Sequence, residues 1–451
     1  MAPAVALSRQ PLVRHVATLQ VGAAAAAGIG FVGSALLARA LGSSEYGLYA
    51  LAFSAVSLTA LLTDLGQNLG AVTLWAEAVA LGSLERAGLV GAYVLRTSLI
   101  SSGIVFLAAL LLAPLAGTLL YHEPRLGLLV IVLLGAKVWG PALRIPLIAL
   151  QVTRRMPLLV TLETADLLLR STLSVLAALA GFGALGAVVG QAVGGLAIAG
   201  AAVALYLRLE PAEPRLPSLR TMLGLALRGD VPMRHPLGFG LSVVLERDLR
   251  IVANSLPPLL LGLVAPTAEV GVFRVALSYM TLPTLLHEPL TRVLMVTFPQ
   301  TRTQGAQALG AAYWRSTTIT AGGVLLVALG LAAVAPWVVP LVYGREYATS
   351  GSVALLLGLA AAAGGLNATN IPLLRSLNRV LPTVWLGAVA LLASLAPMVW
   401  LIGRYGAFGA AAAYSLGAVV LALTSQWVAW RALASSGARP GASRAADQDN
   451  A

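Results

Sequence analysis

Long apolar runs, broken by short polar or Gly/Pro-rich stretches, follow one another along almost the whole chain. A helix needs roughly 20 mostly apolar residues to cross the hydrocarbon core of a bilayer. The runs reach this length, so they predict an all-α polytopic membrane protein with about 12 transmembrane helices. We expect these helices at residues 16–41, 46–78, 87–113, 125–150, 156–181, 184–208, 233–264, 267–300, 312–342, 349–376, 379–403 and 406–433.

The composition agrees with this pattern. Of the 451 residues, 59% are hydrophobic and 10% are charged, whereas roughly 25% are charged in an average soluble domain. The bilayer is therefore the main solvent of this chain. Arg9 and Arg14 with the apolar residues that follow resemble a signal peptide, but the stretch 16–41 is too long for one, and we expect it to remain as the first helix.

The net charge of +12 would favour a nucleic-acid partner in a soluble protein. Here much of the charge lies in loops between apolar runs, so membrane orientation explains it and we expect no nucleic-acid partner. With the N-terminus in the cytoplasm, most loop arginines lie inside, and the outer loops hold Arg39, Arg125, Arg345 and Arg404. This asymmetry predicts that both termini lie on the cytoplasmic side of a bacterial inner membrane.

The order of apolar runs and polar or Pro-rich stretches predicts that the chain has four regions. Residues 1–208 form an N-terminal six-helix lobe, and residues 209–232, rich in Pro and Arg, form a cytoplasmic inter-lobe linker. Residues 233–433 form a C-terminal six-helix lobe. The tail 434–451 is rich in Ala, Ser and Gly and too polar to pack, so we expect it to be disordered in the cytoplasm.

An internal repeat supports the division into two lobes. The segment Glu45-Tyr-Gly-Leu-Tyr49 matches Glu269-Val-Gly-Val-Phe273, and this pair defines the offset of the repeat. Two further matches keep nearly the same offset, between 155–157 and 379–382 and between 182–187 and 405–410. Because six is an even number of helices, both copies enter the membrane in the same sense. The halves are therefore predicted to be parallel repeats about an axis along the membrane normal.

At Leu41-Gly-Ser-Ser-Glu-Tyr-Gly-Leu-Tyr49, followed by Asp64-Leu-Gly66, the chain resembles bacterial polysaccharide transport proteins of the lipid-linked oligosaccharide flippase type. Further similarity lies in Arg247-Asp248, in Tyr343-Gly-Arg-Glu-Tyr347 and in the paired Gly-Ala turns of the repeat. These proteins belong to the multidrug/oligosaccharidyl-lipid/polysaccharide exporter superfamily. The resemblance covers most of the chain.

The resemblance implies two six-helix bundles that form a V and alternate between inward and outward openings. It also implies a flippase that moves an undecaprenyl-diphosphate-linked oligosaccharide, the repeat unit of a polysaccharide, from the cytoplasmic to the outer leaflet. The expected partners are the lipid-linked glycan, the bilayer, and the polysaccharide polymerase and chain-length machinery. No cofactor is expected, and the chain is expected to be a secondary-type transporter rather than an enzyme.

Ionisable residues at membrane depth are costly and usually face a bundle interior or a wet cavity, so they are the candidate site residues. An anionic diphosphate would be held by cations in a low-dielectric cavity, with Arg offering a bidentate fork. Several of the cations lack an obvious carboxylate one helical turn away. The candidates for diphosphate contact are Arg247, Arg96, Lys137, Arg250 and Arg274.

Other intramembrane charges have local partners or suit ion coupling. Three acid–base pairs lie four residues apart, so each is predicted to be a structural ion pair on one helical face. Buried carboxylates and imidazole can change protonation during a transport cycle, which makes some of them candidates for a coupling proton or Na⁺. The pairs are Asp166–Arg170, Glu246–Arg250 and Glu288–Arg292, and the coupling candidates are Asp64, Glu163, Asp166 and His287.

Several chemistries have no support in the sequence. The chain has no cysteine, no phosphate-binding Gly-rich loop of the ATPase type and only four scattered histidines, so we expect neither ATP hydrolysis nor a metal cluster. Two alternatives to the flippase remain open. One is a Na⁺- or H⁺-coupled multidrug exporter of the same superfamily, and the other is a membrane polysaccharide polymerase or ligase, which would need an extended outer loop.

Overall fold

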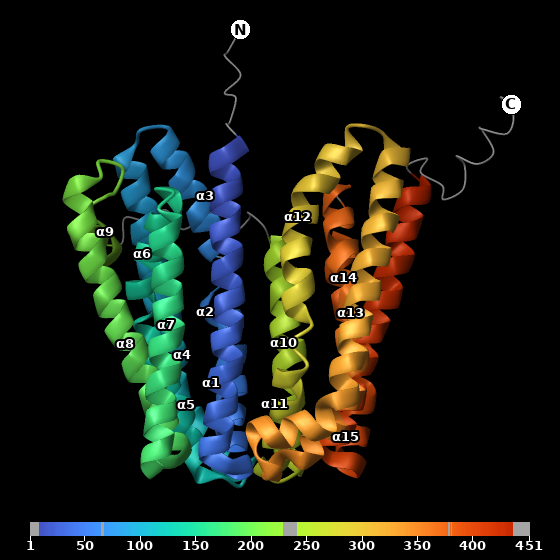
Figure 1. Cartoon of the computed structure of the whole chain (residues 1–451). Coiled ribbons are helices and arrows are strands. Elements are labelled where there is room, and N and C mark those ends of the chain that lie inside the picture. Colours follow the sequence, from blue (N-terminus) through green and yellow to red (C-terminus); the bar gives the residue numbers. More distant parts are fainter. Residues whose placement is uncertain (1–8, 65–66, 229–240, 378, 380, 436–451) are drawn as a thin grey trace, which may run out of the picture. The chain divides into compact units, whose positions relative to one another are not determined.

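The computed structural model describes residues 9–64, 67–228, 241–377, 379 and 381–435. Contacts divide the chain into two compact units, Met1–Leu41 with Ala55–Leu241, and Gly42–Ser54 with Ser242–Ala451. The short segment Gly42–Ser54 thus belongs to the second unit, although the rest of the N-terminal half belongs to the first. Figure 1 shows that the long helices of each unit run side by side.

Helices account for nearly all of the first unit. Short breaks, rather than long loops, separate consecutive elements, as expected where backbone groups must find partners without water. The elements are α1 (Arg9–Leu58), α2 (Ala60–Thr63), α3 (Gln67–Ala80), α4 (Leu84–Leu119), α5 (Pro124–Val138), α6 (Gly140–Val152), α7 (Met156–Ala177), η1 (Ala178–Phe182), α8 (Gly183–Leu209), η2 (Glu210–Ala212) and α9 (Leu219–Arg228).

The second unit is built in the same way. It contains α10 (Leu241–Val264), α11 (Thr267–Tyr279), α12 (Thr284–Arg302), α13 (Ala306–Tyr343), η3 (Arg345–Tyr347), α14 (Ala348–Ser376) and α15 (Leu381–Ser435). Together with Gly42–Ser54 of α1, these helices pack mainly through α13, α14 and α15.

Six of these helices are individually long and apolar enough to cross a membrane, and the bent pair α5–α6 makes a seventh span. Two of the six are much longer than one span. Met156–Ala212 has 57 residues and Leu381–Ser435 has 55, whereas one span takes roughly 20. When these and α1 are divided at their internal glycine turns, and α10 and the broken pair α11–α12 are added, the described helices form twelve spans, as the apolar pattern predicted.

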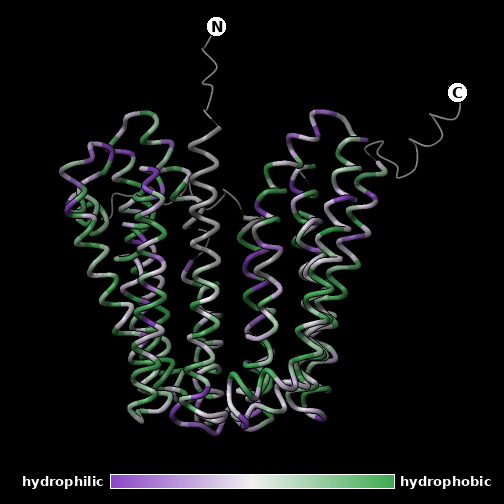
Figure 2. The backbone as a smooth tube through the Cα atoms, viewed as in Figure 1, coloured by the Kyte–Doolittle hydropathy of each residue, from purple (hydrophilic) through white to green (hydrophobic). Residues whose placement is uncertain are grey.

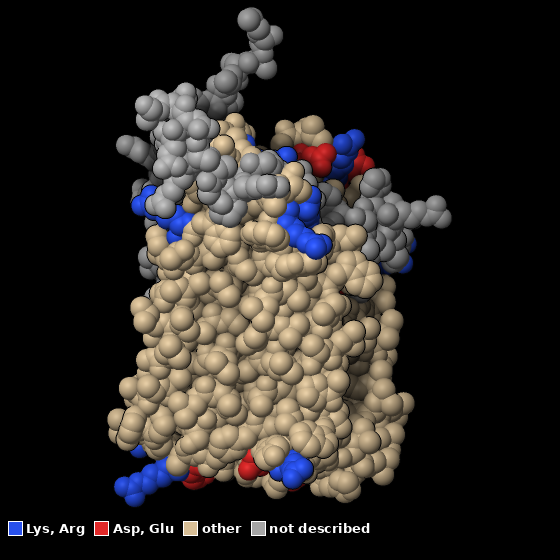
Figure 3. All heavy atoms as spheres, turned by 90° about the vertical axis from the view of Figure 1, so that its right-hand side faces the viewer, with Lys and Arg blue, Asp and Glu red and all other residues tan. Residues whose placement is uncertain are grey.

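The surface has the polarity of a membrane protein. Hydrophobic residues dominate the middle of the helices, and hydrophilic ones gather at their ends (Figure 2). The face in Figure 3 has a broad uncharged band with Lys, Arg, Asp and Glu at its two ends. Tryptophans in the second unit are widely exposed, with Trp337 at 73%, Trp385 at 66% and Trp400 at 60%. Amphipathic rings of this kind mark the two bilayer interfaces.

Chain reversals within the long helices occur at glycines with a positive φ. Gly42 (φ 74°) separates the two spans of α1, and Gly406 (φ 54°) separates those of α15. Each turn is fastened by a carboxylate within the second unit. Glu346 Oε2 accepts from Ser43 N at 3.0 Å, and Glu269 Oε2 accepts from Ala407 N at 3.0 Å. These acids cap the amide groups that a new helix leaves without partners.

Two features of the first half of the chain recur in the second half, at the sequence separation between Glu45 and Glu269. The second span is broken before Ala60 in one half and before its counterpart Thr284 in the other. Residues 43–47 also pack against their own counterparts in α11. A Cβ on Gly47 would overlap the Thr267 carbonyl, and a Cβ on Gly271 would overlap the Ser43 carbonyl. Such a reciprocal contact is the mark of a local two-fold relation, so the repeat seen in the sequence is also a repeat in structure.

The described part of the predicted linker is packed on the first unit. Helix α9 lies against α4, and its Met222 is fully buried in a cluster with Trp75 and Tyr93. The remainder of the linker and the expected start of the seventh helix at 233 fall in 229–240, outside the described residues. Of the predicted disordered tail, Ala434 and Ser435 end α15, and 436–451 lie outside the described residues.

Candidate functional site

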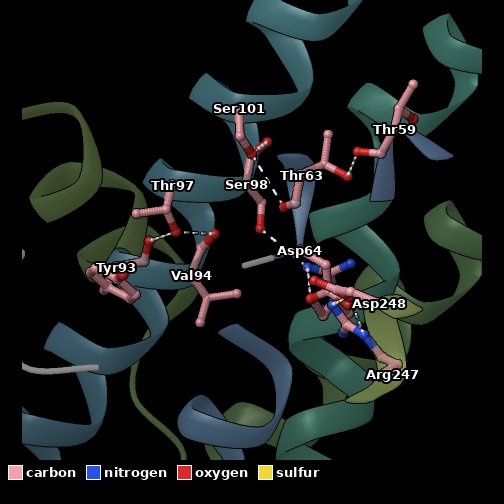
Figure 4. A network of polar contacts seen from close by, with 11 residues as sticks. Thr59, Thr63, Asp64, Tyr93, Val94, Thr97, Ser98, Ser101, Arg247 and Asp248 are labelled. Carbon is pink, nitrogen blue, oxygen red and sulfur yellow. Dashed lines mark hydrogen bonds and ion pairs between the residues drawn. The ribbon is translucent and has the colours of Figure 1, made fainter. Parts of the chain in front are cut away.

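The break in the second span of the first unit carries a polar cluster. Helix α2 ends at Asp64, and the carboxylate Oδ1 lies 3.7 Å from Arg144 Nη1 of α6. The same Arg144 nitrogen donates to Ser98 Oγ of α4 at 3.4 Å. Figure 4 shows Thr63 and Asp64 near Ser98 and Ser101, and Ser101 Oγ donates to the Thr63 carbonyl at 3.3 Å. The arginine therefore ties together three helices that are distant in sequence.

Lys137 of α5 lies at the other end of α2, at the break before Ala60. Its Nζ donates to the Val56 carbonyl at 2.9 Å, and Thr59 Oγ1 donates to that carbonyl at 2.7 Å. Carbonyls in the last turn of a helix have no N–H partner in the helix and carry the negative end of its dipole. Because α1 ends at Leu58, the ammonium group caps this exposed end. The predicted phosphate ligand Lys137 thus has a structural partner here.

Arg96 of α4 is placed differently. The side chain is partly buried, and its Nη1 is buried without a hydrogen-bond partner among the described residues. A buried guanidinium donor left unsatisfied costs free energy. Among the predicted cations in the described residues, Arg96 is therefore the one with a buried donor that has no hydrogen-bond partner.

Next to the cluster lies a cavity of about 290 Å³. Its wall is formed by α3, α6 and α7, and its polar lining consists of Arg144, Gln151 and Glu163. Glu163 is exposed, whereas Asp166, one turn further along α7, is held by Arg170 at 2.6 Å. The cavity thus brings one predicted coupling residue, Glu163, together with Arg144.

The charges at the start of α10 in the second unit are paired. Arg247 Nε and Nη2 both donate to Asp248 Oδ1, at 3.0 and 2.7 Å (Figure 4). Glu246 Oε2 accepts from Arg375 Nη2 of α14 at 2.9 Å and from Thr383 Oγ1 of α15 at 3.2 Å. These contacts neutralise the charges and join three helices.

The remaining predicted residues of the second unit lie apart from these pairs. Arg274 of α11 is near the phenols of Tyr46, Tyr49 and Tyr414. His287 of α12 is partly buried, with Nε2 facing Gly364 of α14 and with Nδ1 buried without a hydrogen-bond partner among the described residues.

Three predictions of charge pairing need comment. The pair Asp166–Arg170 is confirmed. The pair Glu246–Arg250 is wrong, because Glu246 turns to Arg375 and Arg250 is exposed. The pair Glu288–Arg292 is also wrong, since both side chains are exposed and the described residues show no ion pair between them. Water solvates exposed charges well, so a four-residue spacing alone does not hold them together.

A neutral polar network in the second unit was missed by the sequence reasoning. Tyr313 OH donates to Asn370 Oδ1 at 2.7 Å and accepts from Gln426 Nε2 at 2.9 Å, while Asn370 Nδ2 donates to Ser425 Oγ at 2.8 Å. The network joins α13, α14 and α15. The only signal in the sequence is the presence of Asn and Gln within apolar runs, where such residues require partners.

The profile of one protein family, described as "Polysaccharide biosynthesis protein", matches residues 12–302, which is more than half of the chain. The chain belongs to the polysaccharide biosynthesis protein family. This agrees with the resemblance drawn from the motifs. A search of the curated proteins finds no match.

Solved structures share the fold of this family member. An inward-facing multidrug resistance MATE family transporter of the MOP superfamily is similar with a TM-score of 0.70 and 16% identity, over 91% of this chain and 94% of that one. The lipid II flippase MurJ in an inward closed conformation is similar with a TM-score of 0.68 and 11% identity, over 90% and 86%.

A MOP superfamily transporter from Pyrococcus furiosus also matches, with a TM-score of 0.61 and 16% identity, over 94% of this chain and 96% of that one. At these identities the similarity concerns the fold. The fold class predicted from the sequence, a polytopic bundle of two six-helix repeats, is thereby confirmed.

Proposed function

We propose that this polysaccharide biosynthesis protein is a flippase that moves a polyprenyl-diphosphate-linked oligosaccharide across the inner membrane. The observation that carries the proposal is Arg96 of the first unit, which keeps a buried donor without a partner among the described residues, while Arg144 and Lys137 add positive charge near Asp64. A diphosphate supplies negative charge and several acceptor oxygens for these cations.

The cations of the first unit have different roles in binding the diphosphate. Arg96 offers unused N–H groups to phosphate oxygens. The contact of Arg144 with Asp64 is long, at 3.7 Å, and the Arg144 side chain is 28% exposed, so Arg144 exchanges the carboxylate for phosphate at little cost. Lys137 keeps the end of α1 capped and adds positive potential. Of the cations in the second unit, Arg247, Arg250 and Arg274 stay candidates for later stages of the passage.

The exchange of Asp64 for phosphate at Arg144 also suggests how an ion is coupled to transport. When Arg144 turns to the diphosphate, Asp64 loses its contact with this cation, and a coupling cation would take its place. Asp64 is therefore the coupling residue that we favour. Glu163 on the cavity wall is the second candidate, Asp166 is held by Arg170, and His287 lies in the other unit.

The polyprenyl-diphosphate cargo is tested by transport in proteoliposomes. We expect the purified protein to move a fluorescent polyprenyl-diphosphate glycan between leaflets, and inorganic diphosphate to compete. The same liposomes are loaded with a cationic dye as the control. Dye export without glycan movement would replace the proposal by the multidrug exporter, for which the exposed Glu163 in the cavity would serve as the cation ligand.

The orientation can be tested with cysteine probes because the chain has no cysteine of its own. We propose that Arg215 faces the cytoplasm and Arg345 the outside. In intact cells an impermeant maleimide should label Arg345→Cys and leave Arg215→Cys unlabelled until the membrane is opened. The reverse labelling pattern would invert the topology.

A further inference from the structure

Helix α9 presents an exposed side that the transport proposal does not use. Leu227 is 84% exposed, more than any other large hydrophobic side chain of the described residues, and Leu223 is 41% exposed. Arg220 and Arg228 flank them and are also exposed. Arg220, Leu223 and Leu227 lie three to four residues apart, so they form one stripe along the helix.

The opposite side of α9 is fixed to the first unit. Met222 and Ala226 are buried, and Met222 fits against Gly91 of α4 so closely that a Cβ there would overlap its sulfur. Glu210 Oε2 accepts from Leu219 N at 3.2 Å and caps the start of the helix. Tyr206 OH donates to the Pro217 carbonyl at 2.7 Å. The exposed stripe therefore has a set direction.

The depth of α9 follows from the length of α4. This span has 36 residues, or about 54 Å at 1.5 Å per residue, which exceeds the ~30 Å hydrocarbon core. Gly88 and Gly91, which meet Pro217 and Met222, lie in its first two turns. Those turns extend to the headgroup level, and α9 lies beside them. Exposed Leu81, Leu84 and Leu207 continue the apolar surface at this end of the unit.

From these observations we infer that the exposed stripe of α9 is a binding surface for anionic phospholipids of the adjoining leaflet. Leu223 and Leu227 enter the acyl boundary, and Arg220 and Arg228 contact phosphate headgroups. A helix with leucines on one stripe and arginines at its edges matches the chemistry of this interface. The surface is independent of the cargo.

The test uses a bimane fluorophore on a single cysteine at Leu227→Cys, in nanodiscs containing brominated phosphatidylglycerol or brominated phosphatidylcholine at equal content. We expect both lipids to quench the probe and the anionic one to quench it more strongly. Each arginine near the surface favours anionic lipid by roughly fivefold in local concentration. A probe at Thr221→Cys, on another side of α9, should be quenched by aqueous iodide instead.

Replacing Arg220 and Arg228 together by Gln should remove the preference for the anionic lipid, whereas the control Arg345→Gln should keep it. Both variants should melt as the parent does, since these side chains are exposed. Equal quenching by the two lipids in the parent, or iodide access to Leu227→Cys, would overturn the inference. Protection of this position only in native membranes and not in pure lipid would assign the surface to a protein partner and overturn it as well.

Discussion

In the first unit Lys137 and Arg144 contact residues at the two ends of α2, and Arg96 lies on the adjacent helix α4. The equivalent positions of the repeat in the second unit are Thr320, Ala361 and Ala368. The breaks before Ala60 and before Thr284 nevertheless fall at the same position of the repeat. The two copies of the repeat thus share the position of the helix break but differ in the charged side chains near it. This difference underlies our proposal that the first unit binds the diphosphate, whereas the pair Glu246–Arg375 of the second unit joins helices.

We expect the largest loss of stability from substitutions at the reciprocal contact of Gly47 and Gly271. Gly47→Ala and Gly271→Ala each place a Cβ against backbone of the facing helix, so each should cost about 3 kcal/mol or more, seen as lower yield and melting temperature. Gly330→Ala, where nothing lies near a Cβ, is the control and should be neutral. A large loss from one glycine and none from the other would contradict the two-fold relation.

The structural role of the second unit's charges predicts the next effect. Glu246→Gln leaves the partly buried Arg375 without its carboxylate and should cost about 2 kcal/mol, measured as a lower melting temperature. The double change Glu246→Gln with Arg375→Gln should recover most of this loss and keep transport. Failure of the double variant to transport would mean that this pair also serves the cargo.

The capping of α1 predicts a smaller and local effect. Lys137→Met removes one of the two donors to the Val56 carbonyl and should cost about 1 kcal/mol. Hydrogen exchange should quicken near residues 56–63 and remain unchanged around the equivalent break at 280–284. Faster exchange at both breaks would show that Lys137 supports more than this helix end.

The sequence predicted the features that depend on residues close together in the chain, and it did not predict contacts between residues on different helices. The spans and the repeat follow from local apolar patterns, and the pair Asp166–Arg170 follows from helical spacing. The partners Arg144–Asp64 and Arg375–Glu246 come from different spans, so no spacing along the chain reveals them. The wrong prediction of Glu246–Arg250 has the same cause. Glu246 pairs with the partly buried Arg375 of α14 rather than with the exposed Arg250 of its own helix.

The most direct test compares equivalent positions in the two units. Arg96→Gln and Thr320→Val each alter a side chain with a buried polar atom that has no hydrogen-bond partner among the described residues, so neither should lower the melting temperature. Flipping of the fluorescent diphosphate glycan in proteoliposomes should fall by about tenfold or more for Arg96→Gln, the loss of one charge-assisted contact. Thr320→Val should flip at the parental rate. Parental flipping by a stable Arg96→Gln protein would contradict the claim that the first unit holds the diphosphate.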